Sequence, residues 1–107
     1  MAYNIDLATR MRKALSKHVD FEEKKMFGKL AFMVRDKLCL SVGMNKMMCR
    51  VDPALHDELI QAPGCKTVIM GGKAYPGYIY VAVENVQSAK SLDYYIGLAL
   101  QFNARIT

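Results

Sequence analysis

Five side chains are of types that bind transition metals or act as nucleophiles, namely Cys39, Cys49, Cys65, His18 and His56. Zinc ligands usually include a close pair such as C-x-x-C or H-x-x-x-H, and no pair here has that spacing. Cys39 and Cys49 could meet across a hairpin, but two thiols fill only half of a tetrahedral shell. We therefore expect buried cysteines that behave as small hydrophobic residues, and no metal site.

Covalent catalysis by cysteine requires a neighbouring base or a positive environment. Cys49 precedes Arg50, but consecutive residues of a strand point to opposite faces. We expect His18 to pack on the apolar side of its helix and His56 to be solvated on a polar one. No Gly-x-Ser-x-Gly motif occurs. The sequence thus predicts no catalytic residue, no enzyme activity and no cofactor.

A glycine pair beside a lysine, Gly71-Gly72-Lys73, is the only segment that suggests phosphate binding. It lacks the complete P-loop pattern, and no predicted helix follows it directly. Backbone amides of such a loop can form an anion-binding nest. A flexible loop between strands, with glycines at positive φ, explains the same residues more simply.

Positive charge is concentrated in the first half of the chain. The net charge is +5; residues 1–50 hold eleven Lys/Arg and five Asp/Glu, whereas residues 51–107 hold four and five. This asymmetry predicts a surface for an anionic partner, or lysines that merely keep the protein in solution. The candidate surface consists of Arg10, Lys13, Lys17, Lys24, Lys25, Lys29, Arg35 and Lys37. Nucleic-acid binding would also require exposed aromatic side chains, for which Tyr75, Tyr78 and Tyr80 are candidates.

The hydrophobic pattern predicts helices at both ends of the chain and strands between them. Residues 5–18 have helical periodicity after a capping Asn4, and residues 88–105 have it after Ser88. Alternation predicts a hairpin of residues 30–34 and 38–42, a returning strand over 47–51, and an edge strand over 22–26. Asp52-Pro53 opens a short middle helix that Pro63-Gly64 ends.

Residues 71–77 read as an exposed loop between strands at 67–70 and 78–83, because Pro76-Gly77 suits a type II turn. The candidate protein-contact residues of this loop are Gly71, Gly72, Lys73, Tyr75, Pro76, Gly77 and Tyr78. Together the elements predict one α+β domain over residues 1–107. Its antiparallel sheet of meander and hairpins carries the N- and C-terminal helices on one face.

The chain also offers no sign of export or membrane insertion. It begins without the basic and apolar segments of a signal peptide, and it contains no apolar run of membrane-spanning length. An odd number of cysteines argues against a disulfide framework. We therefore expect a cytoplasmic protein with no membrane partner.

Several blocks in order resemble the TfoX/Sxy N-terminal domain of bacterial competence regulators. The blocks are Lys25-Met26-Phe27-Gly28, Leu30-Ala31-Phe32-Met33-Val34, Lys37-Leu38-Cys39, Arg50-Val51-Asp52-Pro53 and Gly77-Tyr78-Ile79-Tyr80-Val81. Lys29 stands where a second glycine is common in that family. The resemblance implies an α+β fold, a role in transcription regulation and no established enzyme chemistry. Longer regulators carry a C-terminal helical domain, so we expect a stand-alone N-terminal domain here.

Three functions remain open. The first is a regulatory or adaptor domain that acts through protein contacts, including contacts in a homodimer. The second is direct DNA or RNA binding through the basic first half. The third is a ligand-binding domain or unrecognised enzyme, with a pocket lined by methionines and a tyrosine. In the shared Met26-Phe27-Gly28 segment, we expect Gly28 to permit a bend and Met26 or Phe27 to anchor in the core.

Overall fold

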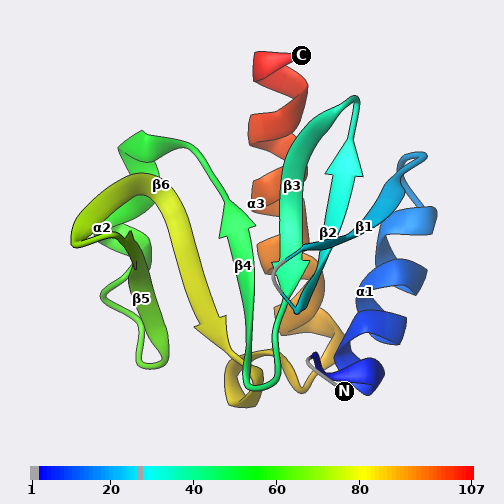
Figure 1. The fold of residues 1–107 in the computed structure, drawn as a ribbon, viewed down its shortest axis with the longest axis horizontal. Coiled ribbons are helices and arrows are strands. Elements are labelled where there is room, and N and C mark those ends of the chain that lie inside the picture. Colours follow the sequence, from blue (N-terminus) through cyan, green and yellow to red (C-terminus); the bar gives the residue numbers. More distant parts are fainter. Residues whose placement is uncertain (1–2, 27) are drawn as a thin grey trace.

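A computed structural model describes residues 3–26 and 28–107 and shows an α+β domain. Six antiparallel strands form one sheet in the order β1-β2-β3-β4-β6-β5 (Figure 1). The elements follow one another as α1 (Ile5–Ser16), β1 (Glu22–Met26), β2 (Lys29–Val34), β3 (Lys37–Val42), β4 (Lys46–Arg50), the 3₁₀ turn η1 (Pro53–Leu55), α2 (His56–Leu59), β5 (Cys65–Met70), β6 (Lys73–Ala82), the 3₁₀ turn η2 (Val83–Val86) and α3 (Ala89–Ile106). The predicted fold class is confirmed.

Both long helices begin at the predicted capping residues. The Asn4 side chain accepts a hydrogen bond from the Leu7 amide, and the Ser88 side chain accepts one from the Ser91 amide. Both helices bury their apolar sides in the core, and Figure 1 shows α3 behind β3 and β4. The helical residues of that core include Leu7, Met11, Leu15, Leu92, Ile96 and Ala99. The two helices thus pack on one face of the sheet, as predicted.

The hairpin of β2 and β3 contains a tight turn and a β-bulge. Arg35 and Asp36 form the turn with φ values of 53° and 65°, as a type I′ turn requires. Further along, Phe32 pairs with Leu40 but Met33 pairs with Leu38, so Cys39 is an extra residue on β3. This bulge lets Cys39 join the helix-covered core next to Leu40.

The prediction of a loop over residues 71–77 was wrong. Only Gly71 and Gly72 form the turn, with φ values of 59° and 74°, and β6 already begins at Lys73. Pairing with β5 extends β6, because Met70 lies opposite Lys73 and Ile69 opposite Ala74. The Pro76-Gly77 pair makes a kink within the strand instead of a turn between strands.

The kink in β6 follows from a shift in the pairing register. The ladder between β5 and β6 jumps from Thr67 opposite Ile79 to Ile69 opposite Ala74. The β6 residues between these two pairs have no regular partner on β5, so the missing amide hydrogen of Pro76 breaks no ladder bond there. Strand pairing has therefore overridden the local turn preference of Pro76-Gly77.

Within the described residues, no helix has the length and apolar character needed to cross a membrane.

Candidate binding surface on the open face of the sheet

The sheet face opposite α1 and α3, here called the open face, presents one continuous row of side chains across all six strands. Each member is the cross-strand partner of the next, and the row runs Lys24, Ala31, Ser41, Met48, Tyr80 and Lys66. Directly opposed residues point to the same face of a sheet, so these side chains lie side by side. The row has small or apolar residues in the middle and a lysine at each end.

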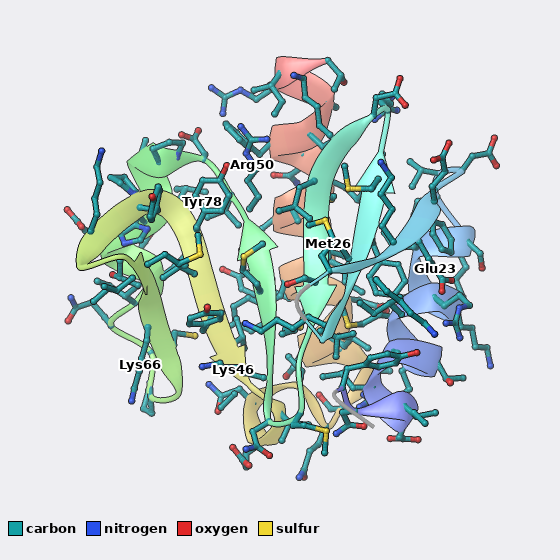
Figure 2. The ribbon with its side chains drawn as sticks, in the orientation of Figure 1. Glu23, Met26, Lys46, Arg50, Lys66 and Tyr78 are labelled. Atoms are coloured by element: carbon teal, nitrogen blue, oxygen red, sulfur yellow. The ribbon has the colours of Figure 1, made fainter. Side chains whose placement is uncertain are left out.

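The open face is a trough, because the two edges of the sheet curl towards each other. A hollow of about 270 Å³ is lined both by Met26 of β1 and by Val68 and Met70 of β5, although these strands are the two opposite edges of the sheet. In Figure 1, β1 and β5 lie on the viewer's side of the sheet, and Figure 2 shows Met26 in front of β3. The remaining lining residues are Lys29, Ala31, Leu38, Ser41, Met48 and Tyr80.

Long unbranched side chains cover the floor of the trough. Ala31, Met48 and Val68 are at most 8% exposed, whereas Met26 and Met70 above them are 38% and 54% exposed. Methionine has three rotatable bonds and adapts to irregular surfaces. The cover can therefore rearrange around a partner without disturbing the strands below.

Positive charge borders this apolar floor. The Nζ atom of Lys46 lies 4.0 Å from the centroid of the Tyr80 ring and that of Lys29 lies 5.3 Å from it. The guanidinium carbon of Arg50 lies 5.4 Å from the centroid of the Tyr78 ring and 5.6 Å from that of Phe102 on α3, so this cation lies at the end of β4 towards α3 and not beside the hollow. Such cation–π contacts contribute roughly 0.5–1 kcal/mol each at exposed sites, and those at Tyr80 hold two lysines beside the trough, of which Figure 2 labels Lys46.

A second hollow of about 300 Å³ adjoins the trough. The two hollows share Tyr80 in their linings, and the second includes Lys66 at the end of the row. The lining of the second hollow also includes Lys46, together with one carboxylate, Glu84. Asp20, Glu22 and Asp36 line another hollow beside the β2–β3 turn. Glu22 lies two residues before Lys24 on β1 and so shares the open face, but among the described residues no acidic side chain lines the hollow of the trough itself.

The eight predicted anion-surface residues do not form one surface. Lys24 and Lys29 lie on the open face, but Lys25 is the next residue along β1 and points to the other side. Arg10, Lys13 and Lys17 line a hollow between α1 and the start of α3. Arg35 and Lys37 lie at the β2–β3 turn.

Two of these arginines hold the fold together. Arg10 donates hydrogen bonds of 2.8 and 2.9 Å to the carbonyl oxygens of Val86 and Gln87. Arg35 donates one of 2.9 Å to Oδ1 of the buried Asn103 on α3. Their hydrogen-bonding groups therefore serve the tertiary structure.

Sequence reasoning missed Lys46, Arg50 and Lys66 as members of a basic surface. A signal was available in β4, where Lys46, Met48 and Arg50 alternate with buried residues. A similar alternation places Tyr78 and Tyr80 on the same face of β6. The register between β4 and β6, which brings these two patterns together, is not readable from either strand alone.

Other predicted site residues have structural positions. In the predicted contact loop, Gly77 is buried and Tyr75 is half-buried within β6, so they are not tips of a loop. Gly28 has φ of 76° at the turn between β1 and β2, as expected. Of the two residues expected to provide the core anchor, Met26 faces the trough instead, and Phe27 lies outside the described residues.

Each of the two histidines lies in the environment that was predicted for the other. His18 is exposed because α1 ends at Ser16, so His18 is not part of the helix and does not lie on its apolar side. His56 is only 7% exposed and lies beneath the kink of β6. Its Nδ1 atom accepts a hydrogen bond of 3.0 Å from the Gly77 amide, and its Nε2 atom lies 2.9 Å from Oγ1 of Thr67. No local pattern indicated this contact, since 21 residues separate His56 from Gly77.

The three cysteines are buried, as predicted. Burial raises the pKa of the Cys39 thiol to about 12 and raises the pKa of the Cys49 thiol as well. The Cys65 sulfur lies 3.4 Å from the Tyr95 hydroxyl, and burial is the main cause that raises the pKa of that tyrosine. The Cys39 and Cys49 thiols are therefore poor nucleophiles at neutral pH. Among the described residues, no three His, Cys, Asp or Glu side chains are grouped as metal ligands.

The fold and the trough define a small α+β domain with one helix-covered sheet face and one basic, methionine-lined open face. The family model of the TfoX N-terminal domain matches residues 13–103. The chain therefore belongs to the TfoX N-terminal domain family. Neither a curated protein nor a solved structure matched it.

Proposed function

We propose that this chain is a non-catalytic regulatory domain, of the competence-regulator type, that acts by binding another macromolecule on the open face of its sheet. The trough is the observation that carries this proposal. It combines an apolar floor, exposed methionines and a border of three lysines on a single face. Exposed apolar patches bordered by polar residues are typical of interaction sites.

Family membership supports a regulatory role, since the TfoX N-terminal domain is not a known enzyme family. The environments of the cysteines point the same way. Catalytic thiols are usually accessible and have lowered pKa values, whereas burial raises those of Cys39 and Cys49.

A transcriptional reporter tests the proposal in cells. The chain is expressed in a naturally competent bacterium that lacks its own regulator of this family and carries a reporter for a DNA-uptake gene. We expect wild-type protein to raise the reporter signal and the double variant K46E/K66E to lose most of this effect. Both lysines are exposed, so the reversal changes the charge of the open face without altering the core.

The matched control is K13E/K17E, which reverses the same number of exposed lysines at the C-terminal end of α1, on the other side of the sheet. It should activate as the wild type does. Equal activity of K46E/K66E and wild type would exclude the open face, and an inactive wild-type chain would contradict the regulatory role. Thermal unfolding of each variant verifies that loss of signal is not loss of folding.

Direct nucleic-acid binding is the second candidate, because cations and tyrosines share the open face. Fluorescence anisotropy with labelled duplex DNA and single-stranded RNA tests it at about 50 and 200 mM salt. With about four phosphate contacts, the slope of log affinity against log salt should be near −4 on duplex DNA. Absence of binding at both salt concentrations would exclude this candidate.

A further inference from the structure

We propose that the trough binds an acidic amphipathic helix of a protein partner. This inference rests on the proposed function, since it names the class of macromolecule that occupies the open face. It follows from three properties of the trough: its shape, its methionine cover and the distribution of its charges.

The shape suits a single helix that runs along the trough. Strands in a sheet lie about 4.8 Å apart, so the row from Lys24 to Lys66 spans roughly 24 Å along the curved sheet. Curling brings Met26 and Met70 to one hollow and narrows this span. An α-helix with its side chains is about 10–12 Å across, which is less than the span of the row, so a single helix can lie over the floor between the two lysine borders. The other face of the sheet already packs α1 and α3 in the same manner.

The lining suits the apolar stripe of an amphipathic helix. Met26, Met48 and Met70 all line the hollow, and Met26 and Met70 are exposed. Two of the six exposed large hydrophobic residues among those described thus lie at this place. Flexible methionine surfaces repack around helical anchors at positions i, i+3, i+4 and i+7.

The charges lie on both sides of the apolar floor and favour acidic flanks on the helix. Lys24 and Lys29 come from the β1–β2 side, whereas Lys66 comes from the β5–β6 side. Carboxylates on the two flanks of a bound helix would face these ammonium groups while its apolar stripe meets the floor. Complementary charge of this kind speeds association and excludes basic segments.

Single-stranded nucleic acid fits the same surface less well. Bases bind such surfaces by stacking on aromatic rings. Here two lysine ammonium groups lie over the Tyr80 ring, and the Arg50 guanidinium lies over the Tyr78 ring. The floor between them offers methionine and valine side chains, which suit apolar residues better than phosphates.

A displayed library of random 16-residue peptides tests the occupant directly, with the full-length protein as bait. We expect the selected peptides to carry net negative charge and apolar residues at helical spacing. NMR amide shifts of the protein on addition of a selected peptide should map to the open-face residues of β2, β3, β4 and β6. The proposal would be overturned if the amide shifts were confined to α1 and α3, if the selected peptides carried no excess of acidic residues, or if the selection enriched no peptide.

Two double variants test separately whether peptide binding depends on the methionines of the trough or on its lysines. M26S/M70S and K46E/K66E should each weaken peptide binding at least tenfold. The controls are M44S, whose methionine is 51% exposed but lies at the β3–β4 turn, and K13E/K17E at the C-terminal end of α1; both should bind within twofold of wild type. Equal weakening by a control variant would contradict a site in the trough.

The same samples distinguish failure of this inference from failure of the proposed function. If a labelled oligonucleotide shifts the open-face amides and no peptide does, the helix is excluded but a binding role of this face stands. If light scattering shows a dimer of the wild type and a monomer of M26S/M70S, a second copy of the chain occupies the open face and replaces the helix. If neither probe binds and K46E/K66E activates the reporter as wild type does, both proposals fail.

Discussion

Gly77 combines a positive φ, a close backbone approach and two hydrogen bonds in one residue, and the first two require the absence of a side chain. Its φ is 87°, a conformation that other residues adopt only at a cost. An added Cβ atom would lie 2.9 Å from the Val51 carbonyl oxygen. Its amide donates to Nδ1 of His56, and its carbonyl accepts a hydrogen bond of 2.7 Å from the Val51 amide. The hydrogen bonds with His56 and Val51 therefore hold the kink of β6 in place, at a position that only glycine occupies without strain.

Replacing Gly77 tests this role, with Gly72 as the control. Gly72 has a similar φ of 74°, but an added Cβ there would meet nothing within 4 Å. We expect Gly72→Ala to lower the free energy of unfolding by about 1 kcal/mol from backbone strain alone. Gly77→Ala should lower it by about 3 kcal/mol, because the clash adds to the strain.

Urea unfolding followed by circular dichroism measures both values. Equal effects of the two substitutions would show that the close approach of Gly77 to Val51 adds nothing to stability.

At the scale of elements, β1 is attached to the domain in two ways. It pairs with β2 along its whole length, although all five of its side chains are exposed. It is also tied to α1, because Arg12 donates hydrogen bonds of 2.5 and 2.8 Å to the two carboxylate oxygens of Glu23. This second link holds the curled edge of the sheet that carries Met26.

The link between α1 and β1 should depend on pH. The hydrogen bonds from Arg12 lower the pKa of Glu23 in the folded protein below its value in the unfolded chain. The resulting stabilisation is present at neutral pH and is lost as the pH falls through the folded-state pKa of Glu23. The side chains are 42% and 31% exposed, so we expect about 0.5 kcal/mol.

Urea unfolding of wild type and Glu23→Gln at pH 7 and at about pH 3 measures this contribution. The difference in free energy of unfolding should be present at pH 7 and vanish at the lower pH. Glu22→Gln, at the neighbouring position on the open face, is the control. A difference that is the same at both pH values would contradict an ionic link.

At the scale of the whole molecule, one core protects all three cysteines. Cys39, Cys49 and Cys65 belong to the same buried cluster beneath the helices. They come from β3, β4 and β5, so no local opening of a single hairpin exposes all of them. Their reactivity therefore reports on the integrity of the domain.

We expect native protein to react with a disulfide reagent such as Ellman's reagent at least a hundredfold more slowly than unfolded protein. Both low accessibility and the raised pKa of Cys39, about 12, act in this direction. All three thiols should react after denaturation in guanidinium. Rapid labelling of one thiol in the native state would contradict its burial and would restore that cysteine as a candidate nucleophile.

The sequence by itself determined the helices, their caps and the hairpin of β2 and β3. These features depend on neighbouring residues: Asn4 and Ser88 cap helices locally, and alternation of apolar residues predicts strands. Local reasoning failed at Pro76-Gly77, because pairing between β5 and β6 outweighed turn preference. It also failed at His56, whose partners lie 11 and 21 residues away.

The tertiary structure alone decided the candidate binding surface. Its row joins Lys24, Ala31, Ser41, Met48, Tyr80 and Lys66 through five separate strand registers. A shift of one residue in any register would move a strand's side chains to the other face. The basic first half of the sequence thus indicated that cations were present. Only the strand order and the curl of the sheet determined which of them border an apolar trough, because those depend on contacts between residues far apart in the chain.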